Sequence, residues 1–214
     1  MPAEWDRVRS WTEDHHHSST LDPDEAEIVT ELRDVGVPLT RLEEFANVKL
    51  IYHDALPILL EHLRRPHSDF TKGSLYRILT FKPAPIEVHN ALVDELRRNS
   101  EQLSRQPLFW LGDAIVQTAP RGSLDSVLEV ASTPKYREAR VVPIEKLAKS
   151  RHPSARDVIG QYFAEGSNLP TAIRALRLAK MWDYADRVEA FANSSNVVVR
   201  DEARKYLRSA KGAK

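Results

Sequence analysis

The chain has 214 residues, a formal net charge of zero and no cysteine. The lack of cysteine excludes disulfides, thiolate nucleophiles and cysteine-ligated zinc or iron–sulfur sites. No stretch approaches the roughly 18 uncharged residues that a membrane span needs, and the N-terminus lacks the basic and apolar regions of a secretory signal. We therefore expect a cytoplasmic protein without membrane association. Its length suits one folded domain.

The charges are unevenly distributed along the chain. Residues 1–34 hold ten acidic and three basic side chains, a net charge of −7, whereas residues 135–214 hold nine acidic and seventeen basic ones, a net charge of +8. Such an asymmetry is compatible with an acidic partner or nucleic acid. It is equally compatible with screening of the basic end by the acidic one, so charge alone identifies no ligand.

The N-terminal part predicts a flexible arm and a helical cap. Residues 1–20 are acidic and polar and show no apolar period, which favours a flexible arm, and residues 21–214 then form the folded domain. Asp22 followed by Pro23 is typical of a helix start, and the apolar stripe after it stops at Gly36, so we expect a helix over about residues 23–35. Thr40 predicts the cap of a second, short helix.

Helical pairs then recur along the chain. Each second helix has apolar residues one turn apart, and the later residue of each pair serves as an anchor. Successive anchors are 29 to 36 residues apart, and they are Leu79, Ile115, Leu147, Leu176 and Leu207. The first helices are expected over residues 56–63, 86–96, 124–131, 158–163 and 185–191. Five hairpins follow, and because each leaves apolar surface on both flanks, stacking is required to form a core.

The repeated segments resemble those of HEAT-like repeat proteins, in particular the small bacterial single-domain type. Residues 52–63, 111–115, 172–176 and 199–207 carry the resemblance, which covers about residues 24–210. It implies an all-α fold, a right-handed α-solenoid of about five HEAT-like helical hairpins with an N-terminal helical cap. The chain departs from the family pattern at three positions. Pro143 stands at a small-residue position and predicts a kinked or late-starting helix. Pro134 lies in a connection, and we interpret Gly73 as loosening its helix.

The resemblance also nominates a surface. In such families the second helices line a concave face that binds proteins or nucleic acid, and catalysis is uncommon. The position two before each anchor is polar in every repeat, and the resulting polar row consists of Arg77, Asp113, Glu145, Arg174 and Lys205, with Trp110 beside it. Aromatic and arginine side chains often anchor protein interfaces, so we expect these six residues to bind a partner. The alternative is a solvated helix face with Trp110 half-buried against its neighbour.

Metal and cofactor sites find little support in the sequence. His53, Asp54 and His62 lack the spacing of His-Glu-x-x-His, and we interpret the histidines as surface residues. The tract His15–His17 can bind a transition metal loosely without forming a defined site. The seven glycines form no phosphate-binding loop. We expect no metal and no small-molecule cofactor.

These observations favour a non-enzymatic scaffold or adaptor that binds another protein, and an immunity-type or regulatory protein is its most specific form by analogy. The alternative is a HEAT-like nucleic-acid-binding protein or DNA glycosylase, since Trp110, Asp113 and Trp182 are of the residue types found around a damaged nucleotide in such enzymes. A bilin-lyase-like role has no residue of its own to support it.

Overall fold

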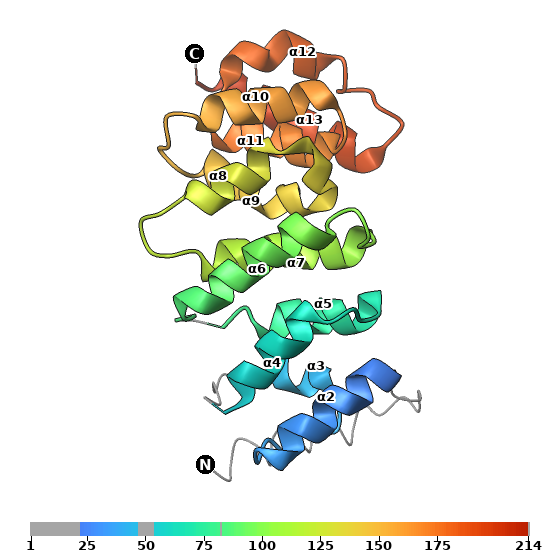
Figure 1. The fold of residues 1–214 in the computed structure, drawn as a ribbon. Helices are drawn as coiled ribbons and strands as arrows, with labels where there is room; N and C mark the ends of the chain where they lie inside the picture. Colours follow the sequence, from blue (N-terminus) through green and yellow to red (C-terminus); the bar gives the residue numbers. More distant parts are fainter. Residues whose placement is uncertain (1–21, 47–53, 82, 214) are drawn as a thin grey trace. The chain divides into compact units, whose positions relative to one another are not determined.

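The computed structural model describes residues 22–46, 54–81 and 83–213, and these residues are helical with no strand. The expected arm, residues 1–20, lies outside the described residues. The described part contains twelve α-helices and two 3₁₀ helices (Figure 1). In chain order the helices are α2 (Pro23–Asp34), α3 (Leu42–Ala46), α4 (Ala55–Arg64), α5 (Asp69–Ile78), α6 (Ile86–Asn99), α7 (Arg105–Thr118), α8 (Asp125–Ser132), η1 (Pro134–Arg140), α9 (Val141–Ala148), α10 (Ala155–Glu165), α11 (Leu169–Leu178), η2 (Trp182–Tyr184), α12 (Ala185–Glu189) and α13 (Val197–Lys211).

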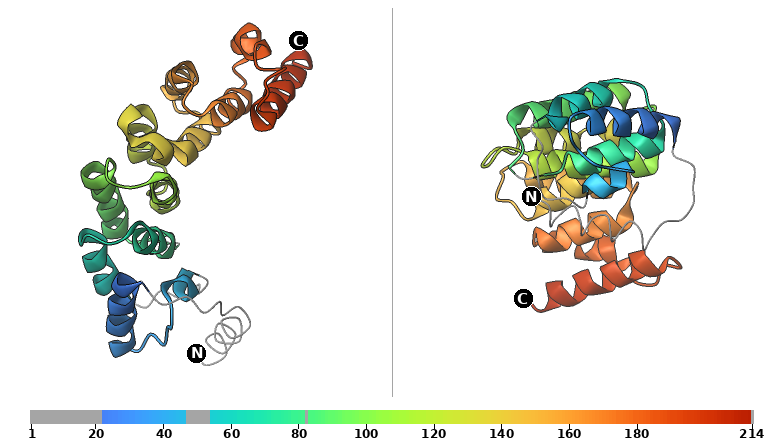
Figure 2. Two further views of the ribbon diagram at one scale, coloured as in Figure 1. Left: turned by 90° about the vertical axis from the view of Figure 1, so that its right-hand side faces the viewer. Right: turned by 90° about the horizontal axis from the view of Figure 1, so that it is seen from below.

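The chain divides into two compact units, Met1–Thr118 and Ala119–Lys214. In unit 1, helices α2 and α3, α4 and α5, and α6 and α7 form three hairpins. The first helices α2, α4 and α6 contact one another in sequence, and so do the second helices α3, α5 and α7 (Figure 2). Helices α2 and α3 correspond to the two N-terminal helices expected from the sequence.

Unit 2 repeats this pairing. Helices α8 and α9, α10 and α11, and α12 and α13 are in contact as hairpins, and the second helices α9, α11 and α13 lie side by side. Helix α10 also contacts α8. All ten helices expected for the five helical pairs are therefore present.

The predicted core positions are buried at every repeat but the last. Leu79, Ile115, Leu147 and Leu176 are fully buried, as is Ala203. Leu207 is only partly covered, and the anchor assignment at α13 is wrong by one residue, because Tyr206 takes the buried position instead. The Tyr206 hydroxyl donates a hydrogen bond to the Met181 carbonyl. A tyrosine can fill this position because its polar tip reaches an acceptor.

Local sequence signals account for the helix ends. Asp22 accepts a hydrogen bond from the Asp24 amide at 3.0 Å, Pro23 occupies the first turn, and Gly36 follows α2 with φ of 84°, a value that glycine adopts without strain. Ahead of α3, the Glu44 carboxylate accepts from the Thr40 amide at 2.9 Å. The amide of Leu42 donates to Glu25 at 2.8 Å, which ties α3 to α2, and burial raises the pKa of the Glu25 carboxyl.

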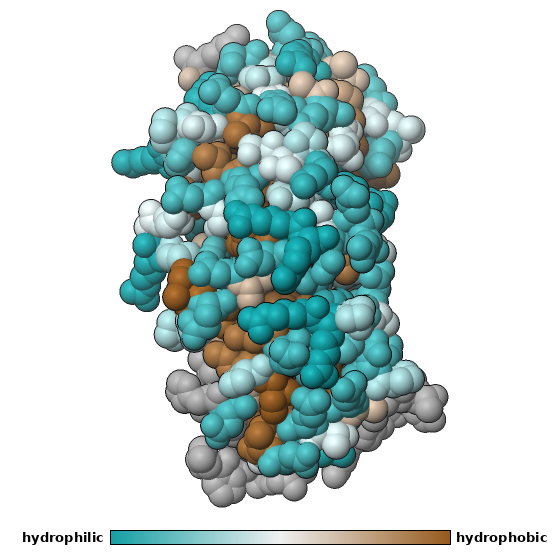
Figure 3. All heavy atoms as spheres, viewed as in Figure 1, coloured by the Kyte–Doolittle hydropathy of each residue, from teal (hydrophilic) through white to brown (hydrophobic). Residues whose placement is uncertain are grey.

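Pro143 does not kink a helix. Helix α9 begins at Val141, so Pro143 lies in the first turn, where its missing N–H breaks no helical bond. The preceding residues form η1, which contains Arg137 at φ of 41°. The late start expected from the sequence is confirmed. On the face drawn in Figure 3, hydrophilic side chains cover most of the surface, with hydrophobic atoms showing mainly between them. This distribution is expected of amphipathic helices that bury one stripe.

Candidate functional site

The polar row falls into two sets, one in each unit. Arg77, Trp110 and Asp113 belong to unit 1, where α5 and α7 lie side by side. Glu145, Arg174 and Lys205 belong to unit 2, on α9, α11 and α13. The polar row therefore comprises two surfaces, one in each unit.

In unit 1, Trp110 of α7 lies against the backbone of α5 at Gly73. A Cβ atom added to Gly73 would lie 2.4 Å from Cζ3 and 2.5 Å from Cε3 of the Trp110 ring. No real side chain tolerates such contacts, so the glycine is required for the ring to sit where it does. Gly73 therefore has a packing role in place of the loosening role expected from the sequence. This role accounts for a glycine inside a helix, where glycine otherwise costs about 0.5–1 kcal/mol relative to alanine.

Arg77 lies over the same ring. Its Cζ atom is 5.6 Å from the Trp110 ring centroid, within the range of a cation–π contact. Arg77 is exposed and Trp110 is half-buried, so both present atoms to solvent. The contact orients the guanidinium while leaving its N–H donors available to a ligand.

Phe70 extends this surface at the start of α5. It precedes Gly73 by three residues and Arg77 by seven, a spacing that places all three along one helix face. Its side chain is 54% exposed, a large value for phenylalanine. We call Phe70, Gly73, Arg77 and Trp110 the Trp110 surface. Asp113 is not part of the Trp110 surface. Its carboxylate instead accepts a hydrogen bond from Gln117 Nε2 at 3.2 Å within α7.

In unit 2 the row forms a network of ion pairs across three helices. Arg174 of α11 lies 3.0 Å from Glu145 of α9 and 3.6 Å from Glu202 of α13. Glu202, whose side chain is 5% exposed, also contacts Lys205 at 3.0 Å and Arg177 at 3.7 Å. We call these five residues the Arg174 network. The Arg174 network contains two acidic and three basic side chains, so its charges are close to balanced. Each of these side chains already has a partner of opposite charge before any ligand binds.

The remaining candidate residues do not come together. His53 lies outside the described residues, Asp54 is exposed, and His62 is completely buried, so the interpretation of His62 as a surface histidine is wrong. For the glycosylase alternative, Trp110 and Asp113 lie in unit 1 and Trp182 in unit 2. The Trp182 ring packs edge-on against Tyr206 with centroids 5.4 Å apart, which gives it a role in packing.

The sequence did not identify Phe70 as a candidate site residue, nor did it reveal the packing of Trp110 against Gly73. One signal was present, since a glycine inside an otherwise regular helix marks close approach of another group. In the part of the chain that the structure describes, no helix has the length and apolar character needed to cross a membrane. No protein-family model matches the chain, and no curated protein or solved structure does either.

Proposed function

We propose that the chain is a non-enzymatic protein-binding scaffold or adaptor that docks its partner on the second-helix faces, with the Trp110 surface as the anchor. The observation that carries the proposal is the seating of Trp110 over Gly73 with Arg77 stacked on its ring. A rigidly held aromatic ring beside an exposed guanidinium and an exposed Phe70 has the composition of an interface hot spot. A right-handed solenoid of HEAT-like hairpins, acting as an immunity-type or regulatory protein, is the form of this proposal that the sequence resemblance favours.

The chemistry of the surface defines the kind of partner. Arg77 offers paired N–H donors that match a carboxylate, while Phe70 and Trp110 offer apolar area. The partner is therefore a protein segment that presents an acidic side chain next to an apolar one. Asp113 follows Trp110 by one helical turn and adds negative charge that disfavours a phosphate backbone.

A specific observation in unit 2 favours the nucleic-acid alternative. Helix α13 carries Arg204, Lys205, Arg208 and Lys211 around a surface pocket that also includes Asp201 and Leu207. Four basic side chains on one helix are suited to phosphate contacts, whose strength falls steeply as salt rises. If this face binds nucleic acid, a short duplex should bind the wild-type chain and lose affinity both with salt and in Arg208→Glu.

The test compares baits that differ in one surface residue. Wild-type chain, Arg77→Glu, Trp110→Ala and Glu87→Lys would be used to capture partners from a nuclease-treated lysate of the native host. Glu87 is an exposed residue of the first helix α6 and serves as the control. We expect the wild-type and Glu87→Lys baits to retain one partner that both other variants lose, with purified affinities weakened by at least about tenfold.

Two outcomes would contradict the proposal. A partner retained equally by Arg77→Glu and Trp110→Ala binds elsewhere on the chain. A partner lost only in Glu87→Lys binds the first-helix face. Since Arg77 is exposed, its variant separates lost binding from lost folding, which circular dichroism would verify.

A further inference from the structure

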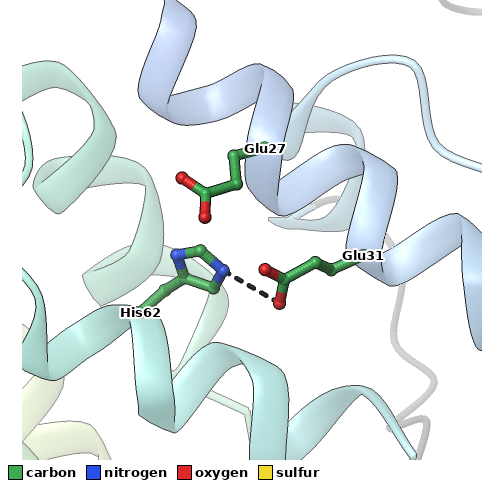
Figure 4. Close-up of side chains that lie close together, drawn as sticks. All are labelled: Glu27, Glu31 and His62. Carbon is green, nitrogen blue, oxygen red and sulfur yellow. Dashed lines mark ion pairs between the residues drawn. The ribbon is translucent and has the colours of Figure 1, made fainter.

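A buried histidine faces two carboxylates between α2 and α4 of unit 1. His62 of α4 is fully buried, and its Nε2 atom lies 3.1 Å from Oε2 of Glu31 on α2 (Figure 4). That nitrogen makes no hydrogen bond of acceptable geometry. A buried nitrogen left in this state costs free energy, so its surroundings call for an explanation.

Glu27 completes the cluster from the next turn of α2. Glu27 and Glu31 are four residues apart, and Figure 4 shows both carboxylates directed toward the His62 ring. One ligand atom from each of the three residues lies within 4.8 Å of the others. Both glutamate side chains are partly exposed, so small rotations can close them around a common ion.

The other nitrogen of His62 is held by a second histidine. His62 Nδ1 lies 3.1 Å from His67 Nε2, the two rings stack at 5.2 Å, and His67 Nδ1 is 3.5 Å from the Asp24 carboxylate. In the tautomer in which His62 carries its proton on Nδ1, that N–H donates to His67 Nε2.

The contact between Nδ1 and His67 is compatible with a free lone pair on Nε2 of His62. With its proton on Nδ1, His62 turns the lone pair of Nε2 toward the oxygen lone pairs of Glu27 and Glu31. Three acceptors that face one another repel unless a cation lies among them. Metal-bound histidines typically have this pattern, since a partner at one nitrogen orients the other toward the ion.

Arg65 supplies a cation at the edge of the cluster. Its NH1 atom lies 3.0 Å from Glu27 Oε1 and 3.8 Å from Glu31 Oε1. The Arg65 side chain is 39% exposed, and its Nε is also 3.5 Å from Glu61, so it has an alternative partner if it turns away. Arg65 therefore competes with an ion for the carboxylates and leaves Nε2 of His62 without a donor.

We propose that Glu27, Glu31 and His62 form a binding site for one divalent transition-metal ion, with Zn²⁺ the best match, that joins α2 to α4. One imidazole and two carboxylates suit Zn²⁺, whereas Mg²⁺ and Ca²⁺ favour oxygen ligands throughout. Three protein ligands leave a fourth position for water. The ion stabilises the folded unit by binding it in preference to the unfolded chain. The site is independent of the Trp110 surface.

The test must first remove the His15–His17 tract as a second binder. A full-length chain with His15→Asn, His16→Asn and His17→Asn would be titrated with ZnCl₂ by calorimetry in the presence of excess Mg²⁺. We expect one Zn²⁺ per chain and a rise in thermal midpoint. Glu27→Gln and Glu31→Gln in this background should each weaken binding by at least about tenfold, while Glu87→Gln, an exposed carboxylate on α6, leaves it unchanged.

Two further variants distinguish an ion site from a simple ion-pair cluster. Arg65→Gln should tighten Zn²⁺ binding by removing the competing cation, and His67→Gln should weaken it by about 10- to 100-fold as loss of a supporting partner. Absence of Zn²⁺ binding in the parent would overturn the proposal and would indicate that Nε2 of His62 donates a proton to Glu31 in a hydrogen bond. Binding that is unchanged in both Glu27→Gln and Glu31→Gln would overturn it as well.

Discussion

The two units use the arginines of their second helices in opposite ways. In unit 1 the Arg77 guanidinium lies over the Trp110 ring and keeps its donors exposed, whereas in unit 2 Arg174 lies between the carboxylates of Glu145 and Glu202. Both residues hold the same position relative to their anchors. The comparison shows that a repeated sequence position fixes a place on the helix but leaves its chemistry to the neighbouring helix.

The interiors of the units differ as well. Unit 1 buries a lysine, Lys72, whose ammonium donates to Glu95 at 2.8 Å and to the Leu63 carbonyl at 2.6 Å. Unit 2 buries Arg140, which donates to the Ala131 carbonyl, pairs with Glu165 and stacks on Tyr162. The Glu95 side chain is 0% exposed, whereas the Glu165 side chain is 24% exposed. The Lys72–Glu95 pair of unit 1 is therefore the more deeply buried of the two ion pairs.

The largest effect is expected from breaking the buried pair of unit 1. Lys72→Ala leaves the Glu95 carboxylate buried without its cation, and we expect a loss of about 3–5 kcal/mol in the free energy of unfolding, measured with urea. Replacing the pair together, as Lys72→Met with Glu95→Gln, should recover part of the loss because no unpaired charge remains. A cost below about 1 kcal/mol for Lys72→Ala would mean that water reaches Glu95 in the folded unit.

The next largest effect is expected from disturbing the packing of Trp110 against Gly73. Gly73→Ala places a Cβ 2.4 Å from the ring, and we expect a loss of about 1–3 kcal/mol even though alanine favours the helix. In a Trp110→Ala background the same change should stabilise the chain by about 0.5–1 kcal/mol, because the clash is gone and the helix preference remains. The sign reversal in this double-mutant cycle is the measurement. The same sign in both backgrounds would show that Trp110 does not rest on Gly73.

The helices and most of the core could be predicted from the sequence. Apolar residues one turn apart mark the buried stripe directly, which is why Leu79, Ile115, Leu147 and Leu176 are confirmed as core residues. Caps such as Asp22 involve neighbours in the chain and are equally local. At α13 the stripe was displaced by one residue because Leu207 and Tyr206 are both apolar enough to fill it, and only the contact with Met181 distinguishes them.

Contacts between helices could not be predicted in the same way. Spacing along one helix gives its faces but not the residue that the next helix places opposite. The polar row and its neighbour Trp110 therefore gave Arg77, Trp110 and Arg174 as candidates without revealing which of them would be partnered. The cluster of Glu27, Glu31 and His62 was missed for the same reason, since two glutamates one turn apart look like a solvated face until His62 of another helix is found beside them. Glu95 was similarly hidden, because its lysine lies on the preceding helix.

A smaller effect compares the two arginines directly. Arg174→Glu removes two ion pairs and places a third carboxylate beside Glu145 and Glu202, so we expect a loss of about 1–2 kcal/mol at low salt. Since the Arg174 side chain is 40% exposed, solvent screens these interactions, and most of the loss should vanish near 1 M NaCl, where the Debye length is about 3 Å. Arg77→Glu should cost no more than about 1 kcal/mol, the scale of an exposed cation–π contact. Equal, salt-sensitive losses for both variants would remove the distinction between the two surfaces.

The smallest effect is a dependence on pH that arises from the core of unit 1. His89 of α6 is buried, its Nδ1 atom lies 3.1 Å from the Thr118 hydroxyl, and burial lowers its pKa from the ordinary 6.5. The unfolded chain therefore takes up a proton below about pH 6.5 that the folded chain resists, so the stability from neutral His89 is present above that pH and is lost as the pH falls. We expect urea unfolding to show a loss of less than about 1 kcal/mol between pH 7 and pH 6, reduced in His89→Gln. Thr118→Val removes the hydrogen bond without removing the titrating ring, so it should lower stability at both pH values and keep the wild-type slope. A slope in His89→Gln equal to that of the wild type would assign the pH dependence to other groups.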